Sequence, residues 1–415
     1  MDGTAMNIFF SVGEPSGDLH GANLIRQLQQ RLPGLRTTGF GGPKMAAAGC
    51  ELMQDMTELA VMGLGPVLAK LPKFFELRRR AREAFQQSRP DAVVLIDYPG
   101  FNWHIARAAK EQGIPVIYYG LPQLWAWASW RVKKVQRYVD HALCKLPFEE
   151  KWFREQGCSA TYVGHPYFDE LRSQQPDEAF VATLRQKPGR LITLLPGSRT
   201  QEVKNNLPLL LRAAQHVHRA VPDVHFAIAS YNDRQAAAAR EMSAAMRLPV
   251  ETHVGRTCEL IREAHSTLAC SGSVSLELLY HARPSVIVYK VPWVTYNVVR
   301  RALINVQYFT LVNLLAVDNI HPPVLRPYEP NEPGHEQVLF PEYGTWKDRS
   351  ADVAAHAIEW LNNPAAHQAL VGRLEALRDR LTSGSASSTA ADYIARVLFG
   401  DSATSTSAAA MRAAA

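Results

Sequence analysis

The chain has 415 residues, of which 47% are hydrophobic and 20% charged, a composition typical of a soluble globular enzyme with about two domains. Its longest notable uncharged stretch, residues 302–317, contains three amides and is shorter than the roughly 20 apolar residues of a membrane span, so we predict none. The net charge of +6 suits an anionic partner, but it does not choose between nucleic acid, a membrane surface and a phosphorylated substrate.

The start of the chain and its cysteines bear on the compartment. Residues 1–10 contain an acid and no basic segment, so we expect no signal peptide. The five cysteines are odd in number and not closely paired, which predicts reduced thiols and neither a disulfide framework nor a zinc site. These cysteines are Cys50, Cys144, Cys158, Cys258 and Cys270.

The first residues predict a strand, a glycine turn and a helix. Residues 7–12 are the strand, residues 13–18 the turn, and apolar residues spaced from 19 to 32 form a helical stripe that Asp18 can cap. A second glycine turn, residues 39–43, follows another short strand. Neither turn matches the G-x-G-x-x-G dinucleotide fingerprint, and the P-loop pattern is absent from the sequence.

A basic stretch follows at residues 71–82, with five positive charges against Glu76. It fits a solvated helix face, and it also fits an amphipathic patch that docks on an anionic membrane. On the second interpretation, the membrane contacts in this stretch are Phe74, Phe75, Arg78, Arg79 and Arg80.

Residues 91–96 predict a buried strand that ends at Asp97, and residues 115–119 predict the next strand. Trp125 and Trp127 follow, with several arginines and lysines close behind. Aromatic rings interleaved with base can stack nucleic-acid bases, lie at a lipid–water interface, or form a packed aromatic surface. Further strands are predicted at residues 142–146 and 160–163, and the first half of the chain closes near His165.

A polar stretch, residues 173–189, reads as a linker to the second half. The apolar run 191–195 then predicts a buried strand, which breaks at Pro196-Gly197 and leads into a helix. Such a turn places free backbone N–H groups at the positive end of the helix, where phosphate is attracted. Arg199 adds a planar fork of donors suited to a diphosphate. A tight turn with a surface arginine is the simpler alternative.

A second strand–glycine–helix unit runs through residues 268–280, with Glu277 one turn into the helix. An acid at this position commonly accepts hydrogen bonds from ribose hydroxyls, although a surface glutamate would give the same pattern. Beyond it we predict a loop at 317–337, helix at 351–381, a hinge at 382–389, a last helix at 392–398 and a disordered tail at 400–415.

Alternating strands and helices in both halves predict an α/β fold of two doubly wound parallel sheets that face each other across a cleft. The candidate phosphate donors are Gly197, Ser198, Arg199 and Ser273, and the candidate general bases are Asp97, Glu14, Asp18 and His165. Because no D-x-D or H-E-x-x-H pattern occurs, metal-dependent sugar transfer is not expected, and arginine and helix ends must neutralise a departing diphosphate.

From about residue 6 to residue 398 the chain resembles the lipid-A-disaccharide synthases, glycosyltransferases of the GT-B type with two Rossmann-like domains. Ten short motifs in family order carry the resemblance, which makes a chance match remote. They are SVGEPSGD (11–18), GFGGPKMAAAGC (39–50), LAVMGLGPVL (59–68), IDYPGFN (96–102), LPQLWAW (121–127), LPFE (146–149), GHP (164–166), LLPGSRTQEV (194–203), ACSGSVSLE (269–277) and NLLA (313–316).

The resemblance implies an inverting transfer of 2,3-diacylglucosamine from its UDP donor to the 6-hydroxyl of 2,3-diacylglucosamine 1-phosphate. The product is the β-1,6-linked lipid A disaccharide phosphate, and UDP is both the donor carrier and the second product. One direct displacement is implied, with a base on the acceptor hydroxyl, and the family's essential aspartate matches Asp97. Neither a cofactor nor a metal is expected.

The same resemblance assigns roles to the remaining candidates. Contacts to the nucleotide donor are expected from Gly197, Ser198, Arg199, Glu202, Gly272, Ser273, Glu277 and Asn313. Contacts to the acceptor or to the cleft wall are expected from Glu14, Ser16, Gly17, Asp18, Gln123 and His165. Since both substrates carry acyl chains, Trp125, Trp127 and the basic stretch gain a reason to touch a membrane.

These roles imply a cytoplasmic protein peripherally associated with the anionic inner face of the inner membrane, with no nucleic-acid partner and with a homodimer as a candidate assembly. Residues 1–172 are the expected acceptor-side domain and residues 173–384 the expected UDP-sugar domain. The helix at 385–399 packs back on the first domain or on a partner subunit. The alternatives are a UDP-N-acetylglucosamine 2-epimerase-like enzyme and a nucleotide-sugar-binding membrane adaptor without turnover.

Two departures from the family pattern concern the donor side. The stretch 317–337 is longer than expected, and Val312 stands where the family has a proline. Both bear on the geometry of the loop expected near the donor.

Overall fold

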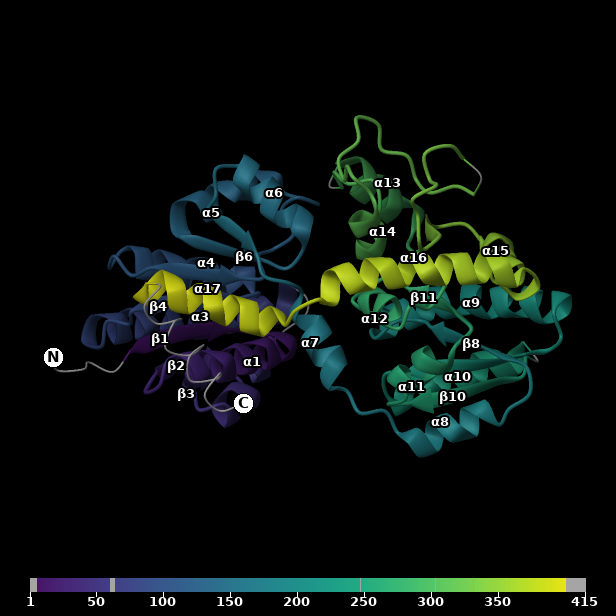
Figure 1. Ribbon diagram of the computed structural model, residues 1–415, viewed down its shortest axis with the longest axis horizontal. Coiled ribbons are helices and arrows are strands. Elements are labelled where there is room, and N and C mark those ends of the chain that lie inside the picture. The colour runs from purple at the N-terminus through teal and green to yellow at the C-terminus, as the bar shows by residue number, and fades with distance from the viewer. Residues whose placement is uncertain (1–5, 60–63, 247, 303, 331, 401–415) are drawn as a thin grey trace. The chain divides into compact units, whose positions relative to one another are not determined.

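The computed structural model describes residues 6–59, 64–246, 248–302, 304–330 and 332–400. The chain divides into two compact units (Figure 1). Unit 1 contains the chain up to Asp169 and from Gly384 onward, and unit 2 contains Glu170–Ser383. The predicted boundaries, 172/173 and 384/385, lie three residues and one residue further along the chain. The predicted disordered tail falls, after Gly400, outside the described residues.

Unit 1 is built on a parallel sheet of seven described strands in the order β3-β2-β1-β4-β5-β6-β7. Helices cover both faces of a sheet of this kind, so its strands are apolar along their length, as in the fully buried run Ala92–Ile96. The strands are β1 Asn7–Val12, β2 Arg36–Gly41, β3 Glu51–Asp55, β4 Ala92–Ile96, β5 Val116–Tyr119, β6 His141–Cys144 and β7 Ala160–Tyr162. The order reverses between β1 and β4, which is where ligands bind in such sheets, beyond the carboxyl ends of the strands.

The helices of unit 1 connect these strands, and the final helix returns to cover them. They are α1 Pro15–Arg31, α2 Pro43–Ala47, α3 Leu64–Gln87, α4 Pro99–Lys110, α5 Val132–Tyr138, α6 Pro147–Glu155, α7 Pro166–Ser173 and α17 Ala386–Phe399, with short 3-10 turns η1 Thr57–Leu59 and η2 Ser129–Arg131. In this chain α17 packs on α1 of its own unit 1, where Arg31 donates to Ser388 over 2.6 Å and pairs with Asp392.

Unit 2 repeats the design with six described parallel strands in the order β10-β9-β8-β11-β12-β13. The strands are β8 Arg190–Leu195, β9 Val224–Ser230, β10 Val250–Val254, β11 Ser266–Cys270, β12 Ser285–Lys290 and β13 Glu342–Thr345. The helices are α8 Glu178–Arg185, α9 Thr200–Ala220, α10 Asp233–Ala245, α11 Thr257–Glu263, α12 Val274–Tyr280, α13 Trp293–Ala302, α14 Leu311–Ala316, α15 Ser350–Asn362 and α16 Pro364–Thr382. Its order reverses between β8 and β11, so the predicted fold class is confirmed in both halves.

One prediction about the secondary structure of unit 2 was wrong and another was confirmed. The expected linker contains α8, because Asp177 caps a short amphipathic run by accepting the N–H of Phe180. The stretch 351–381 is helical as predicted and consists of two helices, since Pro364 offers no N–H to continue the first and Asn363 caps the second. Among the described helices none is long and apolar enough to cross a membrane.

Candidate active site

Asp97 lies directly after β4, at the point where the strand order of unit 1 reverses. Asp97 and Tyr98 both have a positive φ, 44° and 45°. This left-handed backbone conformation is uncommon for residues other than glycine. Strained backbone of this kind persists only where its surroundings hold it, and it is concentrated at functional sites. Here the Asp97 carbonyl accepts from Asn102 Nδ2 over 2.8 Å and from the Tyr118 hydroxyl over 2.7 Å.

Asn102, which is completely buried, joins the ends of β1 and β4. Its amide donates to the carbonyls of Ser11 and Asp97, and its Oδ1 accepts from the Ser11 hydroxyl over 2.7 Å. Asn102 is therefore a positioning residue for Asp97. Asn102 is part of the motif at residues 96–102, but the sequence alone did not distinguish it from the other residues of the following helix.

Lys145, which sequence reasoning missed, pairs with the Asp97 carboxylate. Its Nζ lies 2.9 Å from Asp97 Oδ1, and the two side chains are 18% and 28% exposed, so the carboxylate can still meet an alcohol. The Asp97–Lys145 pair lies next to Gly120, whose φ is +72°. A Cβ at this position would come within 3.1 Å of Lys145 Nζ, so a residue without a side chain suits it. Burial lowers the pKa of Lys145, but the carboxylates of Asp97 and Glu149 outweigh it and raise the pKa above its usual value.

Trp125 was predicted to contact the membrane, and this was wrong. The side chain is 1% exposed and its indole N–H donates to Glu149 over 2.9 Å. Glu149 is itself buried and accepts the backbone N–H groups of Lys145 and Leu146. Trp125 therefore belongs to the support of Lys145, because an indole can be buried when its N–H finds a partner.

Two histidines lie near the Asp97–Lys145 pair. Burial lowers the pKa of His20 to about 4, and burial with the charge of Lys145 lowers the pKa of His165 well below its usual value. Both rings are thus neutral at neutral pH. His165 Nδ1 accepts the N–H of Tyr167, so only its other nitrogen could exchange a proton with a substrate.

The role predicted for Asp18 was also wrong. Its carboxylate is 2% exposed and accepts the backbone N–H groups of Gly42, Lys44 and Met45, so it caps α2 and holds the two glycine turns together. It neither caps α1 nor is free to act as a base. Of the other acceptor-side candidates, the exposed ones are Glu14, Ser16 and Gln123, whereas Gly17 is buried against Val12 of β1.

The predicted membrane contacts of α3 point in different directions. Phe75 is 62% exposed, but Phe74 packs against the rings of Tyr98 and Phe101. Arg80 donates to the Met53 carbonyl over 2.8 Å and lies against the body of unit 1. The prediction for Phe74 and Arg80 was therefore wrong, because the contact face of a helix repeats every three or four residues and a dense run cannot all lie on one side.

The exposed aromatic rings come from α3, where Phe75 lies, and from the segment just before α5. Trp127 is 44% exposed under the Arg131 guanidinium, 5.1 Å from the ring centre, and Trp130, which the prediction omitted, is 66% exposed. Burial lowers the pKa of His104 on α4, and so do Arg78 of α3, Lys134 of α5 and Arg107. Positive charge from three helices, α3, α4 and α5, therefore acts on His104.

In unit 2, the turn after β8 has the predicted strand–turn–helix form, with Gly197 at φ +117° and α9 beginning at Thr200. Its backbone N–H groups are not free, however. Glu202 Oε2 accepts the N–H of Ser198 at 3.2 Å and of Arg199 at 3.1 Å, and its Oε1 accepts from the Arg199 guanidinium at 3.0 Å. The Arg199 side chain, although paired with Glu202, is 64% exposed and can still donate to a diphosphate.

Asn206, also missed from sequence, connects the strand ends that flank this turn. It is buried, it donates to the Glu202 carbonyl and to Cys270 Sγ, and its Oδ1 accepts the N–H of Lys290. The ends of β11 and β12 are thereby fixed to the first turns of α9.

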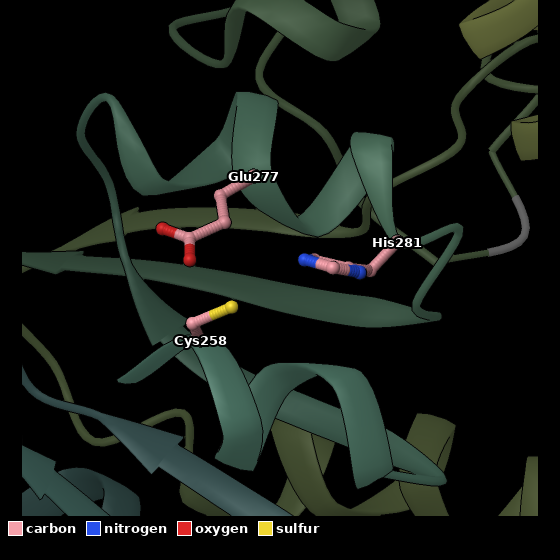
Figure 2. A group of neighbouring side chains, drawn as sticks. All are labelled: Cys258, Glu277 and His281. Atoms are coloured by element: carbon pink, nitrogen blue, oxygen red, sulfur yellow. The ribbon is translucent and has the colours of Figure 1, made fainter. Parts of the chain in front are cut away.

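The turn after β11 presents Gly272 and Ser273 to solvent, and Glu277 follows on α12 as a buried side chain. Figure 2 shows its carboxylate beside Cys258 of α11 and His281 at the end of α12. The ligand atoms of these three residues lie within 4.8 Å of one another, and they are of the types that zinc takes. Burial raises the pKa of Cys258 to about 11 and lowers that of His281 to about 4, so thiol and imidazole are both neutral at pH 7.

Asn313 was predicted to contact the nucleotide, and the structure gives it another role. Its side chain is completely buried, donates to the Phe340 carbonyl and to Glu342, and accepts the N–H groups of Leu339 and Phe340. All of its hydrogen-bonding capacity is used, so Asn313 ties α14 to the chain that enters β13.

Two doubly wound units, one with a held carboxylate at its switch point and the other with an arginine turn, give the chain the GT-B architecture. The family model described as lipid-A-disaccharide synthetase matches residues 8–341. The chain belongs to this family and is a glycosyltransferase.

Individual relatives agree with this assignment. The chain is 39% identical over 321 residues to lipid-A-disaccharide synthase of Anaeromyxobacter sp. (strain K), covering 77% of this chain and 83% of that one. It is 32% identical over 399 residues to the Geobacter sulfurreducens enzyme of the same name, covering 96% and 98%. A UDP-GlcNAc 2-epimerase of Neisseria meningitidis bound to UDP-GlcNAc has a TM-score of 0.60 over 95% of this chain and all of that one, but at 11% identity it shares the fold alone.

Proposed function

We propose that this chain transfers an acylated glucosamine from its UDP donor to the 6-hydroxyl of an acylated glucosamine 1-phosphate, forming the lipid A disaccharide phosphate and UDP. The observation that carries the proposal is Asp97 at the switch point of unit 1, in a chain of the synthase family. Asn102 and Tyr118 hold its backbone carbonyl, and its partly exposed carboxylate is paired with Lys145. The carboxylate removes the proton from the acceptor hydroxyl as that oxygen attacks the anomeric carbon of the donor sugar. UDP leaves from the opposite face, so the configuration inverts.

The two oxygens of Asp97 have different tasks in this reaction. Oδ1 is held by Lys145, which leaves Oδ2 for the hydroxyl proton. On the donor side Arg199 offers its guanidinium to the diphosphate, whose charge grows as the glycosidic bond breaks.

The direct test is mass spectrometry of the product formed from defined lipid donor and acceptor. A disaccharide phosphate whose mass equals donor plus acceptor minus UDP is expected, together with UDP. An epimerised UDP sugar as the product would favour the epimerase-like alternative, and binding of UDP without any product would favour the adaptor.

We also propose that unit 1 docks on the anionic cytoplasmic face of the inner membrane through α3 and α5. Replacing both Arg78 and Arg79 with serine is expected to weaken sedimentation with anionic vesicles about tenfold or more at low salt, because each basic residue near such a surface contributes about 1 kcal/mol. The matched control replaces Arg26 and Arg36, exposed arginines on α1 and β2 of the same unit. Equal losses in both double variants would contradict a specific surface.

We further propose that the transfer needs no metal ion. Treatment with EDTA followed by desalting is expected to leave the rate unchanged, since a lysine and an arginine already meet the charges that a metal would balance. The Cys258–Glu277–His281 group is where a metal would first be sought. The proposal would be contradicted if the rate of the wild-type protein fell on chelation and recovered with Zn²⁺. A rate of Cys258→Ser that EDTA does not change would then assign the metal to this group.

A further inference from the structure

Unit 2 contains a cavity of about 1010 Å³ beyond the carboxyl ends of β12 and β13. Its walls come from the start of α13, from residues 304–309 and from residues 323–329, and Ser271 of the turn after β11 also lines it. Pockets for small molecules range over roughly 300–1,000 Å³, so this one is large. Figure 1 shows α13, α14 and the neighbouring loops gathered at one side of the unit 2 sheet.

The surface of the cavity is largely aromatic and aliphatic. The rings of Tyr296 and Trp346 lie 4.8 Å apart on one wall, and Phe309, Val306 and Leu325 contribute to the others. Lys347 also lines the cavity, but its ammonium group lies over the Trp346 ring, 5.4 Å from the ring centre. Such a lining favours an apolar occupant.

The polar groups in the walls are largely used by one another. The Arg349 guanidinium binds both oxygens of Glu329, at 2.9 and 2.7 Å. Glu342 accepts the N–H groups of Phe309 and Thr310 at 2.9 and 3.0 Å. These groups therefore offer a sugar or a phosphate little to bind, and the walls are fixed before any ligand arrives.

The long segment 317–337, a departure from the family pattern, forms part of this cavity. Val324 and Tyr328 line it, and the segment is anchored where the Tyr328 ring meets that of Tyr343, 5.6 Å away, and where His335 pairs with Tyr308 at 2.9 Å. The additional length therefore builds a binding wall.

The mouth of the cavity is apolar as well. Of the eight large apolar side chains that are exposed in the described residues, Tyr289 and Val324 line the cavity. An apolar rim that leads into an apolar cavity suits a flexible hydrocarbon chain that arrives from a lipid phase.

We propose that this cavity holds an acyl chain of the sugar-nucleotide donor. The proposal rests on the function proposed above, and it commits to the donor because Ser271 joins the cavity to the turn where Gly272 and Ser273 meet solvent. A sugar placed at that turn has its acyl groups within reach of the cavity. Each CH₂ group that enters contributes up to about fourfold in affinity, so this cavity sets which chain lengths the enzyme accepts.

The experiment measures the affinity of the chain for UDP-glucosamine donors that carry hexanoyl or tetradecanoyl groups, by calorimetry in a fixed detergent, without acceptor. Val324→Asp is expected to weaken binding of the tetradecanoyl donor tenfold or more and to leave the hexanoyl donor and UDP within twofold. Thr295→Trp, which fills the cavity from α13, is expected to shift the preference toward the shorter chain. Val294→Asp is the matched control, because Val294 is 61% exposed against 62% for Val324 and does not line the cavity.

Equal effects of Val324→Asp and Val294→Asp, or the same loss for both donor lengths, would overturn the proposal. Kinetic assays separate the donor from the acceptor: if Val324→Asp changes selectivity for the acceptor's chain and not the donor's, the cavity serves the other substrate and the proposal is wrong. Because binding is measured without turnover, an enzyme that binds long-chain donor yet makes no disaccharide would contradict the proposed function and leave the acyl cavity supported.

Discussion

Replacing Asp97 with asparagine is expected to lower kcat for disaccharide formation about 10³-fold, because the amide cannot take the proton of the acceptor hydroxyl. UDP binding should stay within twofold, since the diphosphate is expected to bind the Arg199 turn. Asparagine is the suitable replacement because it tolerates the left-handed conformation that Asp97 adopts at φ 44°, whereas alanine would disturb the backbone and the base together.

The measurements are kcat with defined lipids and the dissociation constant of UDP by calorimetry. Glu155→Gln, an exposed carboxylate on α6 of the same unit, is the matched control and should behave as wild type. If Asp97→Asn retained full activity, the base would have to be sought elsewhere among the residues around Lys145. If Asp97→Asn lost UDP binding as well, the loss of transfer would be explained by misfolding of the variant and not by loss of the base.

The residues around Asp97 show what a linear pattern can and cannot predict. Asp97 was found because a buried strand ended there, and in parallel sheets chemistry gathers at strand ends. Lys145 also ends a strand, but its meeting with Asp97 depends on β5 lying between β4 and β6. The order of the strands in the sheet decides which strand ends lie side by side, and the local sequence does not specify that order.

The errors share one physical cause, which is that residue type does not reveal which way a side chain faces. Trp125 and Trp127 stand two residues apart in a basic, aromatic stretch, yet one is buried on Glu149 and the other is 44% exposed. Asp18 and Asn313 are polar residues in family motifs, and both are buried and hydrogen-bonded mainly to backbone groups. A motif can therefore identify a family while many of its members build the site and never touch the substrate.

Replacing Arg199 with alanine is expected to weaken UDP binding roughly ten- to a hundredfold, the range for loss of hydrogen bonds to a charged group. The structure supports this expectation, because Glu202 already accepts the N–H groups of Ser198 and Arg199, whereas the Arg199 side chain is 64% exposed. Arg199→Lys should give an intermediate loss, since it keeps the charge without the planar fork. Calorimetry with UDP is the measurement, and Arg219→Ala, at the far end of α9, is the control. Unchanged UDP affinity in Arg199→Ala would mean that the diphosphate displaces Glu202 and binds the N-terminus of α9 instead. In that case Glu202→Gln should bind UDP more tightly than the wild type.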